Sequence, residues 1–154
     1  MTLYFAYGAN MNRALMRRHC PGAMEIGLAA LVGCRFIITT DGYASIVPKP
    51  GGRVHGVLWR LTVRDLAALN AYESLGSGLY SKLMLPVRKD GRRMAATLYV
   101  ARARSGGRPK PGYLDVILAA AREWSLPPPY VRSLQRWQPS RWRGARAAES
   151  GELG

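Results

Sequence analysis

The chain has 154 residues, 48% of them hydrophobic, and its 23 Lys and Arg outweigh nine Asp and Glu to give a formal charge of +14. This length and apolar content favour a globular protein with one core and argue against disorder. No apolar run reaches the ~20 residues of a membrane helix and no secretory signal is evident, so we expect a cytoplasmic protein without membrane contacts. Cys20 and Cys34 have no metal-ligand spacing to His19 or His55, so the sequence indicates neither a metal site nor a disulfide framework.

Short runs of alternating and β-branched residues predict a strand-rich chain. The pair Asp90-Gly91 predicts a hairpin turn between the last two strands, because glycine tolerates the positive φ of a tight turn. The pair Gly51-Gly52 is expected to turn the chain between Val47 and Val54. The predicted strands cover residues 3–7, 25–31, 34–39, 44–47, 53–61, 83–87 and 94–100.

Helical periodicity predicts four helices between and after these strands. Thr62 is placed to cap the second helix, with Asp65 supporting its first turn. The third helix has a single apolar stripe, which predicts one buried face. The helices are expected at residues 12–18, 63–73, 112–124 and 129–137.

Many strands with few crossover helices predict an α+β fold, a small mixed β-barrel flanked by helices. Residues 102–111 contain glycines and prolines and are expected to form a linker or mobile loop. The polar, arginine-rich segment 138–154 is expected to be a loosely ordered tail. The expected organisation is therefore one domain over residues 1–137 followed by a basic tail.

The segment from Tyr4 to Met11 has the features of an anion site. A buried strand runs into a turn opened by Gly8, and a helical pattern follows at once. Backbone N–H groups at such a helix start lack partners, and the helix dipole adds partial positive charge there. The segment therefore predicts a site for a carboxylate or another anion, although many α/β proteins have a glycine after their first strand.

Glu73 stands out from helical spacing alone. It follows Leu69 by four residues, on the face that Leu66 and Leu69 turn toward the core. Burial and the negative end of the helix dipole both favour a neutral carboxyl there, which suits an acid or base working near neutral pH. The alternative is that the helix ends a turn earlier and leaves Glu73 exposed near the cap.

As a literal string, YFAYGANM at Tyr4–Met11 resembles the YFAYGSNL opening of the γ-glutamylcyclotransferase family, also called the AIG2-like family. A second motif matches at the right place, where Glu73 is followed by Gly78-Leu79-Tyr80. A third, looser match is PKPGYLDVILAAAREWSLPPPYV. The resemblance covers roughly residues 3–137 and implies a compact β-barrel with helices packed on it.

The resemblance also implies the reaction, in which the γ-glutamyl group of a small substrate is cyclised to 5-oxoproline with release of an amine, without a cofactor. Glu73 would be the catalytic acid and base. Backbone N–H groups of Gly8, Ala9, Asn10 and Met11 would hold a carboxylate or the developing oxyanion. Tyr7 and Tyr80 would line the pocket, although both also suit ordinary core positions.

The chain departs from the family pattern at Ala9, where Ser is usual, at Met11, where Leu is usual, and at Ser74, where Gly often follows the Glu. No residue distinguishes γ-glutamyl amino acids, γ-glutamylamines and glutathione as substrates. A binding module without turnover is one alternative. Another is a basic nucleic-acid-binding protein that uses residues 132–146, although their charge is more simply a solvated surface and no specific nucleic acid is expected.

Overall fold

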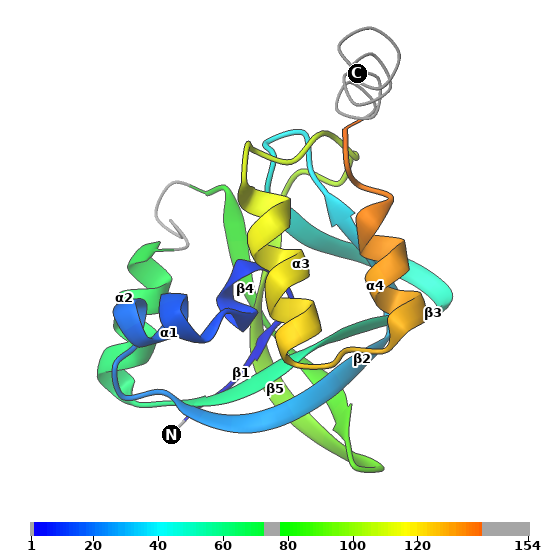
Figure 1. Cartoon of the computed structure of the whole chain (residues 1–154). Coiled ribbons are helices and arrows are strands. Elements are labelled where there is room, and N and C mark those ends of the chain that lie inside the picture. Colours follow the sequence, from blue (N-terminus) through cyan, green and yellow to red (C-terminus); the bar gives the residue numbers. More distant parts are fainter. Residues whose placement is uncertain (1, 73–77, 140–154) are drawn as a thin grey trace, which may run out of the picture.

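The computed structural model describes residues 2–72 and 78–139. The predicted Glu73 and Ser74, and all of the predicted tail beyond Pro139, lie outside the described residues. The described elements, in chain order (Figure 1), are β1 (Thr2–Ala6), a 3-10 turn η1 (Ala9–Met11), α1 (Arg13–His19), β2 (Met24–Ile38), β3 (Ala44–Leu61), α2 (Val63–Tyr72), β4 (Tyr80–Lys89), β5 (Arg92–Ala101), α3 (Tyr113–Glu123) and α4 (Pro128–Gln135).

The strands form a closed barrel in the order β1-β3-β2-β4-β5. Neighbouring strands are antiparallel except β1 and β5, which pair in parallel where Tyr4 meets Thr97 and so close the barrel. Fully buried side chains from the strands, such as Phe5, Leu58 and Leu98, belong to one core. Each such side chain stabilises the fold by about 2 kcal/mol. The predicted mixed β-barrel with flanking helices is thereby confirmed.

β2 and β3 are longer than predicted, and each replaces two predicted strands. Their pairing passes from Val32–Arg53 directly to Cys34–Pro48, so residues 49–52 of β3 lie opposite the single Gly33 of β2. The turn predicted at Gly51-Gly52 is therefore wrong. The glycines, at φ +88° for Gly33 and +76° for Gly51, bend a continuous ladder at a bulge instead of ending it.

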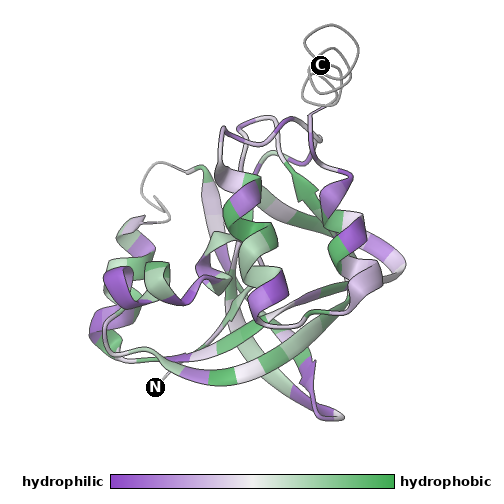
Figure 2. Ribbon diagram, viewed as in Figure 1, coloured by the Kyte–Doolittle hydropathy of each residue, from purple (hydrophilic) through white to green (hydrophobic). Residues whose placement is uncertain are grey.

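The hairpin between β4 and β5 was predicted correctly. Asp90 and Gly91 both have positive φ, 51° and 78°, as a tight two-residue turn between twisted strands requires. Hydrophilic residues gather at this far end of the hairpin (Figure 2). Both strands extend beyond their predicted limits because regular pairing continues from Lys89–Arg92 to Tyr80–Ala101.

The caps of α1 and α2 are local and connect the two helices. The Asn12 side chain accepts a hydrogen bond from the Leu15 N–H at 2.9 Å and so begins α1. At the start of α2, the Asp65 N–H donates to Thr62 Oγ1 at 3.0 Å and the Thr62 N–H donates to Asp65 Oδ2 at 3.2 Å. This confirms the predicted Thr62 cap. Asp65 is also buried and accepts from the Gly22 N–H at 3.2 Å, which fixes α2 against the turn after α1.

α3 packs its apolar stripe on the core and holds the N-terminal loop. The Arg13 guanidinium donates to Glu25 at 2.7 Å and to Glu123, and it lies 3.7 Å from the centre of the Trp124 ring. The Trp124 indole N–H donates to the Met11 carbonyl at 2.7 Å. The end of α3 therefore fixes the chain between η1 and α1.

The predicted linker at residues 102–111 is hydrogen-bonded to the barrel. The Gly107 N–H donates to the Ile38 carbonyl at 2.7 Å, and the Lys110 N–H donates to the Gly42 carbonyl at 3.1 Å. This segment therefore pairs with the chain at the end of β2 and leads directly into α3. None of the helices in the described part of the chain is long and apolar enough to cross a membrane.

Candidate active site

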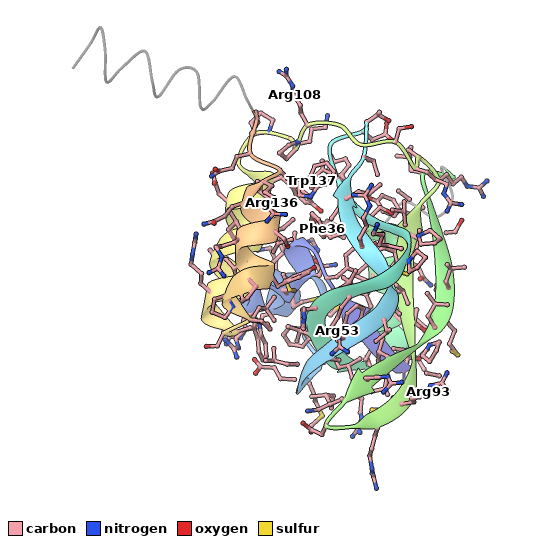
Figure 3. The ribbon with its side chains drawn as sticks, turned by 90° about the vertical axis from the view of Figure 1, so that its right-hand side faces the viewer. Phe36, Arg53, Arg93, Arg108, Arg136 and Trp137 are labelled. Carbon is pink, nitrogen blue, oxygen red and sulfur yellow. The ribbon has the colours of Figure 1, made fainter. Side chains whose placement is uncertain are left out.

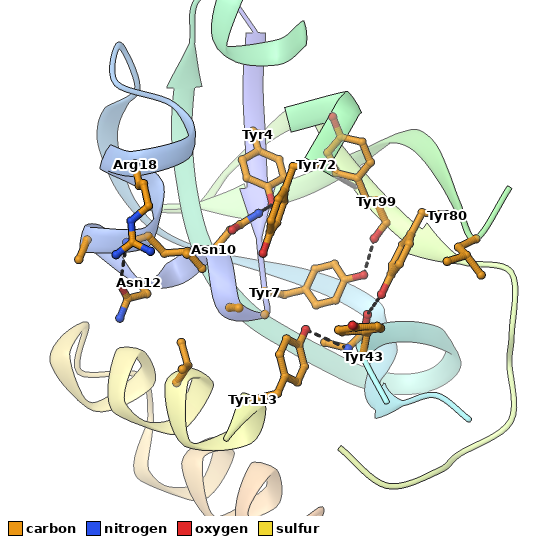
Figure 4. A pocket seen from close by; sticks show the side chains of 17 residues that line it. Tyr4, Tyr7, Asn10, Asn12, Arg18, Tyr43, Tyr72, Tyr80, Tyr99 and Tyr113 are labelled. Atoms are coloured by element: carbon orange, nitrogen blue, oxygen red, sulfur yellow. Dashed lines mark hydrogen bonds between the residues drawn. The ribbon is translucent and has the colours of Figure 1, made fainter. Parts of the chain in front are cut away.

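A cavity of about 560 Å³ lies where loops from both halves of the chain meet (Figure 4). Seven of the chain's eight tyrosines line it, so its wall is largely aromatic with several hydroxyl groups. A cavity of this size and composition fits a small molecule. Its described lining is Tyr4, Tyr7, Gly8, Ala9, Asn10, Asn12, Ala14, Leu15, Arg18, Tyr43, Ala44, Tyr72, Leu79, Tyr80, Tyr99, Tyr113 and Val116.

Hydrogen bonds fix the tyrosines that rise from the barrel. The Tyr7 hydroxyl donates to the Tyr99 carbonyl, and the Tyr99 hydroxyl donates to Asn70 Oδ1 at 2.5 Å. The Asn10 amide donates to the Tyr4 hydroxyl at 3.0 Å. Because each hydroxyl satisfies a specific partner, the rings are held in defined orientations around the cavity.

The opposite wall is organised around Ala44 at the start of β3. Its N–H donates to the Tyr113 hydroxyl at 3.1 Å, and its carbonyl accepts from the Tyr80 hydroxyl at 3.4 Å. The Tyr43 ring meets the Tyr113 ring edge to face at 5.4 Å, and the Lys110 ammonium lies 5.8 Å from the centre of the Tyr43 ring. Residues from β3, β4 and α3 thus form one side of the site.

The predicted anion loop borders this cavity through Gly8, Ala9 and Asn10. Met11 is different: its side chain is fully buried, it does not line the cavity, and its N–H donates to the Gly8 carbonyl at 3.1 Å. Within the described residues, the N–H groups of Gly8 and Ala9 have no hydrogen-bond acceptor. These two donors are therefore available to an anion in the cavity.

Gly8 has little room for a side chain. A Cβ atom there would lie 3.1 Å from the Ala44 Cβ and 3.3 Å from the Tyr113 hydroxyl oxygen. Both contacts are tighter than ordinary packing, so a larger residue would push the loop and the opposite wall apart. The glycine thus allows the close approach of the loop after β1 to β3 and α3 at this point.

The electrostatics of the described lining are simple. Arg18, in the last turn of α1, is its one charged side chain, and none of the described Asp and Glu residues lines it. The His19 ring packs against the Tyr72 ring at 3.9 Å on the edge of the site. Burial and the neighbouring Arg18 charge lower the pKa of His19, so this imidazole is neutral at neutral pH.

The structure thus brings Tyr7, Gly8, Ala9, Asn10 and Tyr80 together around one cavity, with Met11 behind the loop. Sequence reasoning missed Arg18 and four of the tyrosines, and it named Tyr43 only as the end of a loop that could border the pocket. A usable signal was present for Tyr43 and Tyr113, because each directly follows a glycine at a turn. The missed lining tyrosines are Tyr4, Tyr72, Tyr99 and Tyr113.

A second hollow of about 400 Å³, here called the arginine groove, lies between β2, β3 and α4 (Figure 3). The Phe36 ring meets the Trp137 ring at 6.4 Å in it, and Tyr130 packs against the His55 ring at 4.8 Å. Burial raises the pKa of Tyr130. The arginines that line the groove, all exposed, are Arg35, Arg53 and Arg136.

Comparison with known proteins identifies the family of the chain. The model of the AIG2-like family matches residues 53–134, just over half of the chain. The γ-glutamylcyclotransferases of Mus musculus and Homo sapiens are 28% and 27% identical to this chain, and each match covers 92% of it and 81% of the relative.

Solved structures lead to the same family. One described as a γ-glutamyl cyclotransferase superimposes with a TM-score of 0.83 at 26% identity, covering 90% of this chain and 88% of the other. YkqA of Bacillus subtilis gives a TM-score of 0.76 at 25% identity, covering 88% of this chain and 53% of YkqA. The chain belongs to the AIG2-like family and is an enzyme of the γ-glutamylcyclotransferase class.

Proposed function

We propose that this enzyme cyclises the γ-glutamyl group of a small γ-glutamyl compound to 5-oxoproline and releases the amine. The observation that carries the proposal is the convergence of both sequence motifs on one cavity. The loop of Gly8 and Ala9 forms one side of it. Tyr72, directly before the second motif, and Tyr80, at the end of that motif, form another.

The chemistry needs no nucleophile from the protein. The α-amine of the substrate attacks its own γ-carbonyl carbon, a C–N bond closes the five-membered ring, and the original amide C–N bond breaks. Two protons pass from the α-ammonium group to the departing amine, one before and one after ring closure, so the ring nitrogen keeps one hydrogen and the amine leaves as an ammonium ion; no water or cofactor is consumed. The protein has to orient the substrate, accept and return these protons, and stabilise the oxyanion.

We assign the proton transfer to Glu73. No carboxylate among the described residues lines the cavity, so the described part of the chain offers no acidic side chain for this role. Glu73 directly follows Tyr72, and Leu79 and Tyr80 lie just beyond it in the sequence, so residues on both sides of it line the cavity. The likeness to the Glu of the family motif supports the same assignment.

We assign anion binding to the free N–H groups of Gly8 and Ala9. Two adjacent backbone donors suit the substrate α-carboxylate or the oxyanion that forms at the γ-carbonyl. Gly8 is buried and Ala9 is half-buried, so water screens charge interactions at these donors less than at an exposed site. We place the reaction in the cytoplasm, in keeping with the free thiols of Cys20 and Cys34.

The test is production of 5-oxoproline from a panel of γ-glutamyl amino acids, γ-glutamylamines and glutathione. Glu73→Gln removes the carboxylate at nearly constant shape and should reduce kcat by at least about 10²-fold, the lower range for a lost acid or base. Asp90→Asn is the matched control, because Asp90 is exposed at the hairpin tip and Asn tolerates its positive φ. Full activity in Glu73→Gln would refute the assignment. A wild-type protein that binds 5-oxoproline but yields no product would instead be a binding module.

A further inference from the structure

The last turn of α2 leads directly into the residue assigned to proton transfer. α2 ends at Tyr72, whose side chain extends into the cavity (Figure 4), and Glu73 is the next residue of the chain. The position of Tyr72 therefore limits where Glu73 can lie. A reacting group displaced by about 1 Å can lower a rate about 10²-fold, so the contacts that hold this turn affect catalysis.

Several contacts fix the body of α2. Leu69 is fully buried in the core, and the Tyr99 hydroxyl donates to Asn70 Oδ1 at 2.5 Å. At the other end of the helix, the buried Asp65 accepts a hydrogen bond from the Gly22 N–H. These contacts hold α2 as far as Asn70, two residues before its end.

The Tyr72 ring packs against the ring of His19. The centres of the two rings lie 3.9 Å apart and their planes make an angle of 37°, a closer contact than is usual for aromatic pairs. Tyr72 is 47% exposed, so the core restricts its ring less than it restricts a buried one. Packing on His19 therefore removes rotamer freedom at the end of α2.

His19 is held firmly enough to act as a support. It is the last residue of α1, and the chain is anchored on both sides of it, because Met16 is fully buried and the Cys20 thiol contacts the Asp65 carbonyl at 3.5 Å. Burial lowers the pKa of His19, so the ring is neutral at neutral pH and packs on the tyrosine without a charge to hydrate. α1 thus presents a fixed ring to the end of α2.

We propose that His19 is a positioning residue of this enzyme, which packs on Tyr72 and so holds the end of α2 such that Glu73 is aligned with the bound substrate. The proposal rests on the function proposed above and deepens it. His19 is absent from the described lining of the cavity, so it acts through Tyr72 and not on the substrate. Its removal should therefore slow turnover without weakening substrate binding.

A second histidine–tyrosine pair provides a matched control. His55 is half-buried like His19 and packs on Tyr130, with ring centres 4.8 Å apart, and neither residue of this pair belongs to the described lining of the cavity. His19→Ala and His55→Ala each remove one imidazole ring from a tyrosine, so both variants lose a similar packing contact. A difference between their kinetics therefore reports the place of the contact and not a general loss of packing.

The experiment measures kcat and KM for 5-oxoproline formation from the γ-glutamyl substrate that the wild type converts fastest. His19→Ala should lower kcat about tenfold and leave KM, and the Kd of 5-oxoproline, within about twofold of the wild type. His19→Phe restores a ring against Tyr72 and should return kcat to within about threefold of the wild type. His55→Ala should keep wild-type kinetics. Urea unfolding of each variant separates a loss of activity from a loss of fold.

A double variant tests whether His19 acts through Tyr72. If it does, adding His19→Ala to Tyr72→Ala should lower kcat no further than Tyr72→Ala alone. Additive losses, an unchanged kcat in His19→Ala, or an equal loss in His55→Ala or in His19→Phe would each overturn the positioning role while leaving the cyclotransferase function intact. Absence of 5-oxoproline from every substrate with the wild type would overturn both proposals.

Discussion

The tyrosine-lined cavity and the arginine groove differ in how the chain builds them. The cavity collects residues from β1, η1, α1, β3, α2, β4, β5 and α3 and has one charged side chain in its described lining. The groove lies on the continuous β2–β3 ladder beside α4 and has three exposed arginines. Each hollow has one tyrosine packed on a histidine, Tyr72 on His19 and Tyr130 on His55.

This contrast shows that the charge of the protein and the location of its site are separate properties. A formal charge of +14 draws attention to the arginines, but hydrogen bonds among the described residues organise the cavity instead. Converging loops provide backbone donors, enclosure and oriented rings, whereas a regular ladder has its backbone groups already paired. We therefore expect the arginine groove to be a solvated surface that attracts anions without specificity.

The largest difference between the two hollows is expected when one carbon atom is added beside each of them. Gly8→Ala would put a Cβ atom 3.1 Å from the Ala44 Cβ, so the anion loop must shift, and we expect a loss of about 10- to 100-fold in kcat/KM. Gly106→Ala is the control beside the groove, because its Cβ would lie at an ordinary 3.4 Å from the Trp137 ring. Steady-state kinetics of 5-oxoproline formation measure both. Equal activity in the two variants would show that the close approach at Gly8 does not matter.

The stability of the protein should depend more on the buried hydrogen bonds that join α1 and α2 beside the cavity than on the exposed side of α3. Asp65→Ala removes the acceptor for the Thr62 and Gly22 N–H groups at a buried position, and we expect a loss of about 2 kcal/mol in the free energy of unfolding. Asp115→Ala on the exposed side of α3 should change it by less than about 0.5 kcal/mol. Urea unfolding compares the two. A similar midpoint for both variants would contradict the role of Asp65.

The two tyrosine–histidine pairs predict a shared response to acid. Burial lowers the pKa of His19 and of His55 below the ordinary 6.5, with additional repulsion from Arg18 and Arg53. The unfolded chain then binds more protons than the folded one, so the free energy of unfolding should fall as the pH drops through this value. His19→Gln and His55→Gln should each make this pH dependence shallower, as measured by urea unfolding between pH 7.5 and 5.5. An unaltered slope in both variants would contradict it.

Removing charge from the groove should affect binding but not catalysis. The double variant Arg53→Gln, Arg136→Gln should retain activity within about twofold, because neither side chain lines the cavity. Any weak binding of a single-stranded oligonucleotide should lose affinity uniformly across sequences and depend less on salt, by about one unit of slope per contact removed. Strong sequence preference that disappears in the variant would instead identify a nucleic-acid site.

The smallest effect is expected from truncation after Gln138. The shortened chain keeps Trp137, whose ring packs on Phe36 and whose N–H donates to the Leu134 carbonyl. We therefore expect activity within about twofold and a free energy of unfolding within about 0.5 kcal/mol of the full chain. Loss of activity on truncation would show that the predicted domain limit at residue 137 is wrong.

Sequence reasoning predicted features that depend on near neighbours in the chain and failed for features that depend on contacts between distant segments. The Asp90-Gly91 turn and the Thr62 cap depend on neighbours within a few residues, and both were predicted. The turn at Gly51-Gly52 was wrong, because glycines in a strand also permit a bulge when pairing continues on both sides. Arg18 was missed because its distance from the cavity depends on the packing of α1.

The sequence by itself determined the local elements: the predicted helices, the hairpin, and an N-terminal strand that ends in a glycine loop with free backbone donors. Two short sequence motifs were also enough to predict the family. Only the tertiary structure decided that β2 and β3 are continuous, that β1 closes the barrel on β5, and that Tyr4, Tyr43, Tyr99 and Tyr113 share one cavity with Arg18. The physical reason is that periodicity and turn chemistry act between near neighbours, whereas closure and the choice of which side chains meet depend on pairings between distant parts of the chain.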